Sequence, residues 1–128
     1  MTEHGMFHWN ELNTSEPKRA CEFYAATLGW TFEALPTPGF EYYVAKRGDK
    51  MVCGVFEMKG PDFAGIPNHW IAYIAVDDVD ARVAKALAAG GAVRRPAWDA
   101  PGVGRIAVVA DPTGAAVGWM TPARRGRG

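Results

Sequence analysis

Two stretches of this chain start and stop at positions separated by the same number of residues, and this repeat constrains the fold more than any other feature. Ser15 and Asp77 are both good helix-capping residues, and they lie 62 positions apart. Gly29 and Gly91, each able to end a helix, are also 62 positions apart. Because this spacing is about half the chain, the sequence predicts a duplicated structural unit.

Each half shows the same order of elements: one strand, one helix and then three strands. The helices are predicted between the caps and the glycine stops, because apolar residues recur there at helical spacing. The predicted strands are residues 7–12, 30–35, 40–46 and 51–58 in the first half, and 70–76, 92–97, 104–110 and 115–120 in the second. The alternative is two independent α+β halves whose order matches by chance.

The chain has 128 residues, which is enough for one domain with a buried core. We expect a first module at about residues 5–58 and a second at about 69–122. Residues 59–68 contain two prolines and two glycines, so they are interpreted as a linker. Residues 123–128 are rich in arginine and glycine and are expected to form a mobile tail.

Composition argues against several classes of partner. Lys plus Arg is 14 and Asp plus Glu is 14, so the chain lacks the basic excess of most nucleic-acid-binding domains. It has no apolar run long enough to span a membrane, and its first residues lack the layout of a signal peptide. The two cysteines, Cys21 and Cys53, are too few for a multi-bridge framework, so a cytoplasmic location is expected.

Four motifs occur at family-like spacings: FYAATLGW at 23–30, VDDVDA at 76–81, AAGG at 88–91 and GRIAVVADPTGA at 104–115. As an ordered set they resemble the glyoxalase/bleomycin-resistance/extradiol-dioxygenase superfamily, the vicinal oxygen chelate proteins, and HWNEL at 8–12 is similar to a glyoxalase-like branch of unassigned function. The resemblance implies an α+β fold. Two βαβββ modules would form one cupped, mixed eight-stranded sheet, with helices outside and a cavity inside.

Metal-using members of this family carry one ligand, usually His, Glu or Gln, on each of four strands. Carried over onto this chain, those positions fall at Trp9, Gly54, Ile71 and Gly118, with Phe56 as the alternative to Gly54. Trp, Ile and Gly side chains cannot coordinate a divalent cation. The resemblance therefore implies that the family's usual metal site is missing and that no cofactor is bound, while a relocated divalent metal stays open as the alternative.

Five residues are candidates for lining the cavity. Trp9 offers an aromatic surface for stacking a flat ligand, or else fills the space. Glu11 shares strand parity with Trp9; it is interpreted either as a ligand contact or general base, or as a member of a structural ion pair. Tyr73 and His69 lie on the fifth strand, with His69 near the cavity rim. Arg105 is interpreted as a contact for an anionic group or as part of an ion pair.

Three functions remain open, and no catalytic residue is assigned. The first is a metal-independent binder of a small aromatic or polycyclic molecule, of the bleomycin-resistance type. The second is a lyase, isomerase or dioxygenase that uses a relocated metal. The third is a regulatory or interaction module. The missing ligands favour the first. A homodimer is also expected, because modules of this family pair and because strand 51–58 is interpreted as an outer strand that needs cover.

Overall fold

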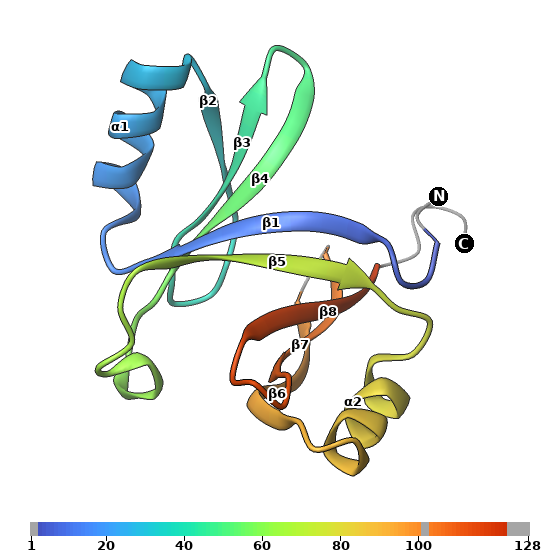
Figure 1. Cartoon of the computed structure of the whole chain (residues 1–128). Coiled ribbons are helices and arrows are strands. Elements are labelled where there is room, and N and C mark those ends of the chain that lie inside the picture. Colours follow the sequence, from blue (N-terminus) through green and yellow to red (C-terminus); the bar gives the residue numbers. More distant parts are fainter. Residues whose placement is uncertain (1–2, 101–102, 123–128) are drawn as a thin grey trace. The chain divides into compact units, whose positions relative to one another are not determined.

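The computed structural model of the protein describes residues 3–100 and 103–122, so the predicted tail at 123–128 lies outside the described residues. The described elements follow the predicted order, one strand, one helix and three strands in each half (Figure 1). In chain order they are β1 (Phe7–Thr14), α1 (Pro17–Leu28), β2 (Thr31–Leu35), β3 (Tyr42–Arg47), β4 (Lys50–Glu57), the 3₁₀ helix η1 (Pro61–Phe63), β5 (His69–Ala75), α2 (Val79–Ala88), β6 (Ala92–Ala100), β7 (Gly104–Ala110) and β8 (Ala116–Pro122). Within these residues, no helix is long and apolar enough to cross a membrane.

The eight strands form one open mixed sheet in the order β2-β3-β4-β1-β5-β8-β7-β6, which confirms the predicted α+β class. The pairs β1–β4 and β5–β8 are parallel, whereas β2–β3, β3–β4, β6–β7 and β7–β8 are antiparallel. β4 therefore lies between two strands, and the expectation that residues 51–58 form an outer strand is wrong. The outer strands of the sheet are β2 and β6. A local sequence pattern does not encode this order, because strand order depends on long-range pairing.

The described residues divide into two compact units. The N-terminal unit is Trp9–Ile71, and the C-terminal unit is formed by the described residues before Trp9 and after Ile71. Both boundaries fall inside strands, β1 and β5, and not in the linker at 59–68.

Helix α1 belongs to the N-terminal unit and begins at Pro17, directly after Glu16. The predicted capping role of Ser15 is wrong, since Glu16 occupies the cap position without a side-chain cap. Ser15 instead donates its backbone N–H to the side-chain oxygen of Asn68, at 2.9 Å. The helix ends at Gly29 as predicted, because this residue adopts a left-handed conformation with φ of 75° that favours glycine.

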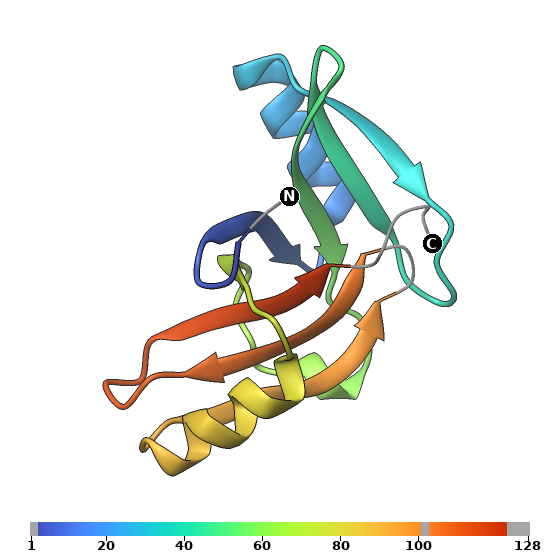
Figure 2. The same cartoon turned by 90° about the vertical axis from the view of Figure 1, so that its right-hand side faces the viewer.

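Helix α2 lies against β6, β7 and β8 in the C-terminal unit (Figure 2). Its cap is Asp78, one residue after the predicted Asp77: the side chain of Asp78 accepts a hydrogen bond from the N–H of Ala81, at 3.1 Å. Such a cap typically contributes about 1 kcal/mol. Val79, which is 1% exposed, packs with Val76 and Ala107, so the first turn of the helix is fixed on the sheet.

Much of the apolar surface of α1 is exposed. Phe23 is 58% exposed and Leu28 is 55% exposed, although both belong to the predicted apolar stripe. Tyr24 instead stacks on Trp30, with ring centroids 5.4 Å apart, and its hydroxyl accepts a hydrogen bond from Trp70 at 3.2 Å. The helix is therefore held by aromatic contacts while part of its stripe stays in solvent.

Candidate functional site

The N-terminal unit contains a chain of hydrogen bonds that starts at Trp9. The indole Nε1–H of Trp9 donates to the phenol oxygen of Tyr42, at 3.4 Å. Tyr42 also shares a hydrogen bond with the carboxylate of Glu11. Glu11 and Tyr42 are only 6% and 7% exposed, so both polar groups are buried. Two of the predicted cavity residues, Trp9 and Glu11, are therefore brought together by a tyrosine on β3.

The environment of Tyr42 fixes its protonation state. Burial raises the pKa of the phenol well above its ordinary value, and the negative charge of Glu11 raises this pKa further, while the indole N–H of Trp9 acts in the opposite direction. Tyr42 thus keeps its proton near neutral pH and donates to Glu11. The arrangement presents one neutral hydroxyl and one carboxyl group in apolar surroundings.

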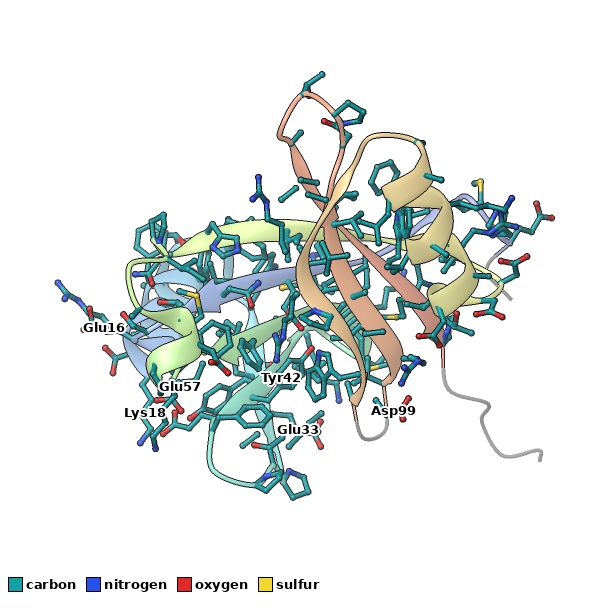
Figure 3. The ribbon with its side chains drawn as sticks, turned by 90° about the horizontal axis from the view of Figure 1, so that it is seen from below. Glu16, Lys18, Glu33, Tyr42, Glu57 and Asp99 are labelled. Atoms are coloured by element: carbon teal, nitrogen blue, oxygen red, sulfur yellow. The ribbon has the colours of Figure 1, made fainter. Side chains whose placement is uncertain are left out.

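Tyr42 packs in a group of aromatic side chains, which we call the ring cluster: Trp9, Phe40, Tyr42, Phe56 and Phe63. Phe56 stands between two others, with ring centroids 5.1 Å from Phe40 and 5.6 Å from Phe63. Figure 3 labels Tyr42 and Glu33 of this unit, and the side chain of Glu33 is 61% exposed. Rings beside a few polar groups, here one hydroxyl and one carboxyl group, are also the residue types that line sites for flat organic molecules.

Gly54 allows Tyr42 to lie where it does. In the strand register Gly54 is opposite both Glu11 and Val44. A Cβ at position 54 would lie 2.6 Å from Cζ of Tyr42, closer still to its oxygen, and 3.2 Å from Nε1 of Trp9. The tyrosine therefore occupies the space that a ligand side chain at this family position would need.

The C-terminal unit shows the same arrangement at Gly118. Tyr73, which is 1% exposed, lies opposite Gly118, and a Cβ there would be 2.8 Å from Cγ of the tyrosine ring. Ile71, at the remaining position, is buried. The side chains of Trp9, Ile71 and the two glycines, at the positions carried over from the resemblance, have no donor that suits a divalent metal. Nor do three or more His, Cys, Asp or Glu residues in the described part of the chain form a group that could hold one.

The register also shows how closely the two halves correspond. One row of residues that lie opposite each other on neighbouring strands passes through Gly54 and also contains Glu33, Val44 and Glu11. The corresponding row passes through Gly118 and also contains Arg95, Val108 and Tyr73. Glu11 corresponds to Tyr73, and Glu33 to Arg95, at the same offset of 62 residues that the helix signals show. The two rows differ in charge, with acidic side chains in the first and a basic side chain in the second.

The structure does not bring Arg105 or His69, the other two candidate cavity residues, to these rows. Arg105 is held by Asp80 of α2, at 2.8 Å from Nε and 3.0 Å from Nη2, and by Asp99 of β6, at 3.2 Å from Nη1. This engages its charge on the side of α2, away from the row of Tyr73. The Nδ1–H of His69 donates to the carbonyl of Pro67, at 2.8 Å, which anchors this side chain to the end of the linker.

Sequence reasoning missed Tyr42, which links the two candidates it had found. The available signal was the alternation along β3, where Tyr42 and Val44 point to one face. Pairing that face with Gly54 and Glu11 required the register of β3 on β4 and of β1 on β4, which the sequence alone does not supply.

Comparisons with known proteins show the family to which this chain belongs. A family model described as Glyoxalase/Bleomycin resistance protein/Dioxygenase superfamily matches residues 6–118. CFP32 of Mycobacterium tuberculosis, provisionally named a glyoxylase, is 46% identical over 124 residues, which are 96% of this chain and 46% of that protein. The anthracycline biosynthesis protein DnrV of Streptomyces peucetius is 34% identical over 120 residues, covering 84% of this chain and 44% of that protein.

This chain thus spans less than half the length of these two relatives. Among solved structures, methylmalonyl-CoA epimerase from Mycobacterium tuberculosis is similar in fold, with a TM-score of 0.66 and 13% identity over 97% of this chain and 94% of that chain.

Proposed function

Because this chain belongs to the Glyoxalase/Bleomycin resistance protein/Dioxygenase superfamily, we propose that it binds a small, flat organic molecule against the ring cluster, without a metal at the family positions. The observation that carries the proposal is the hydrogen-bonded group of Trp9, Tyr42 and Glu11 beside Gly54. In this place a metal-using relative would present ligands, and here the chain presents rings, a hydroxyl and a carboxyl group.

The chemistry of this surface favours a polycyclic aromatic ligand with hydroxyl or carbonyl groups. Rings stack on flat ligands, and the Tyr42–Glu11 pair can exchange its internal hydrogen bond for one to a ligand hydroxyl. One relative is named for anthracycline biosynthesis, and anthracyclines are polycyclic compounds of this kind. This likeness supports the choice of ligand class for a first test.

The test is a titration with 1,4-dihydroxyanthraquinone, followed by quenching of tryptophan fluorescence. We expect saturable quenching, and we expect Trp9→Ala to weaken binding at least about tenfold because it removes the stacking surface. Trp9→Phe, which keeps a ring, should retain most of the affinity. Trp70→Phe, at an exposed ring of the same unit, is the matched control and should bind like the unmodified protein.

Metal content separates this proposal from the catalytic alternative. Protein purified without added metal should contain far less than one equivalent of Fe, Mn, Ni or Zn, and chelator treatment should leave the quenching unchanged. Near-stoichiometric metal, with affinity lost on chelation, would favour an enzyme with a relocated site. Absence of any binding by the folded protein would favour the interaction module.

We further propose that two copies of the chain pair. Exposed apolar side chains support this, since Phe23 and Leu28 of α1 and Trp70 of β5 are all more than 40% exposed in the N-terminal unit. Light scattering during size-exclusion chromatography should give twice the mass of one chain. The double substitution Phe23→Ser with Leu28→Ser should shift the mass toward one chain, while Met51→Ser, at another exposed apolar residue, should not. An unmodified protein that elutes as a single chain at micromolar concentration would contradict the proposal.

A further inference from the structure

Two thiols that the proposed ligand site does not use lie near each other in the N-terminal unit. Cys21 on α1 and Cys53 on β4 are the only cysteines of the chain, and both are free. Cys53 is 2% exposed, and Cys21 is partly buried. Each thiol lies on the face of its own element that is turned toward the other, and α1 contacts β4.

Strand alternation places Cys53 on the side of the sheet opposite to Tyr42. The neighbouring residue Gly54 faces the phenol of Tyr42, so the side chain of Cys53 points to the other face. Ala45, which lies opposite Cys53 in the strand register, is also fully buried. This face of β3 and β4 is therefore covered by another layer.

Helix α1 brings Cys21 to this face. The least exposed side chains of α1 recur at helical spacing and form one face of the helix: Pro17, Ala20, Cys21 and Tyr24. Tyr43 on β3 gives a second indication, because desolvation, Glu41 and then the charge of Cys21 raise the pKa of its phenol. Tyr43 is two residues from Ala45 and thus shares a face with Cys53. Cys21 therefore lies over the part of the sheet that contains Cys53.

The pKa values of the two thiols agree with this placement. Burial, the charge of Cys21 and the charge of Glu11, in this order, raise the pKa of Cys53 to about 11. Burial and the charge of Glu41 raise the pKa of Cys21 to about 11. Because the effect of one charge on another falls off with distance, the two sulfur atoms are close together. Both thiols stay protonated near neutral pH.

Helix α1 also has few local features that hold it in place. Glu16, its cap residue, makes no side-chain cap, and the helix has no acidic residue in its first turn and no basic residue in its last. Most of its side chains are exposed. A disulfide requires Cα atoms about 4–7 Å apart, and a helix with so few local anchors can move the short distance that this bond requires.

We propose that Cys21 and Cys53 are a modification site at which a peroxide forms an intramolecular disulfide that fastens α1 to β4. The thiolate of one cysteine attacks an oxygen of hydrogen peroxide, the O–O bond breaks, and a sulfenic acid and hydroxide form. The other thiol attacks the sulfenic sulfur, the S–O bond breaks, and water leaves as the S–S bond forms. In total, two thiols and one peroxide give one disulfide and two waters. This inference does not depend on the ring cluster or on any ligand.

The test treats the folded chain with hydrogen peroxide at pH 9, where more thiolate is present than at neutral pH. The remaining thiols are counted by alkylation with N-ethylmaleimide in denaturant, and linked peptides are identified by mass spectrometry. We expect loss of both alkylatable thiols, a cross-link between Cys21 and Cys53 within one chain, and recovery of both thiols with dithiothreitol. The thermal unfolding midpoint of the oxidised protein should rise by at least about 5 °C, because the bond closes the loop between the two cysteines.

Cys21→Ser is the matched control. It keeps the buried Cys53, and peroxide oxidises its methionines as it does those of the unmodified protein, so its midpoint should not rise after treatment. Cys53→Ala should likewise give no intramolecular cross-link. The proposal is wrong if both thiols of the unmodified protein stay alkylatable, if they gain oxygen without a cross-link, or if cross-links join separate chains only. A cross-link within one chain that leaves the midpoint unchanged would show that the bond does not fasten α1.

Discussion

Replacing Gly118 with alanine is expected to lower the free energy of unfolding by about 3 kcal/mol. The new Cβ would lie 2.8 Å from Cγ of Tyr73 and closer still to Cδ1 and Cε1. These atoms are at the base and side of the ring, so a turn of the side-chain tip cannot relieve the clash. Tyr73 is 1% exposed and has no free space into which it can move as a whole. Urea denaturation followed by circular dichroism measures the effect.

A double-mutant cycle shows whether the loss comes from this close approach. Tyr73→Leu removes the ring, so Gly118→Ala should cost clearly less in that background, with a coupling of at least about 1 kcal/mol. Ala116→Ser, at an exposed position on the same strand, should change stability by less than about 0.5 kcal/mol. Additive costs at Gly118 and Tyr73 would show that the alanine acts through something other than the ring.

Features that depend on neighbouring residues could be predicted from the sequence. The aspartate before α2 and the glycine after α1 act within one or two turns of chain: the prediction at Gly29 is confirmed, and the aspartate cap lies one residue after the predicted Asp77. The offset of 62 residues gave the two βαβββ halves, because duplicated halves repeat their local signals together. The error at Ser15 is a shift of one residue, since Glu16 is the cap, and the N–H of Ser15 donates to Asn68, 53 residues away.

Features that depend on strand register could not be predicted. Alternation along β1 correctly paired Trp9 with Glu11, but Tyr42 joins them from another strand. β6 has register irregularities between Val93 and Trp98, so counting along this strand does not give the face of a side chain. Arg105 was interpreted as a contact for an anionic group or as part of an ion pair, and two carboxylates hold it on the side of α2. Local patterns therefore specify which face a side chain takes within a strand, while its partners are specified by pairing across the sheet.

The second large effect should appear at alkaline pH and originate from Tyr42. Burial and the charge of Glu11 raise the pKa of this phenol well above about 10, the value expected in the unfolded chain. The folded protein therefore holds this proton more tightly than the unfolded chain does. The resulting stability is fully present below pH 10 and is lost as the pH rises toward the folded-state pKa, by about 1.4 kcal/mol per pH unit.

The measurement is the free energy of unfolding between pH 8 and pH 12, compared between the unmodified protein and Tyr42→Phe. The cysteines contribute a slope of their own, since burial raises the pKa of both Cys21 and Cys53 to about 11, but this slope is common to both proteins. The difference between the two curves should thus be flat below pH 10 and should then change by about 2–3 kcal/mol by pH 12.

Glu11→Gln distinguishes the two causes of the raised pKa of Tyr42. Burial is the larger cause, so the alkaline loss of stability should persist in this variant, but it should end at a lower pH because the neighbouring negative charge is gone. Parallel curves for the unmodified protein and Tyr42→Phe would mean that solvent reaches the phenol. In that case Tyr42 would not be a permanent donor to Glu11, and the polar part of the ring cluster would have to act on a ligand through the carboxylate of Glu11 alone.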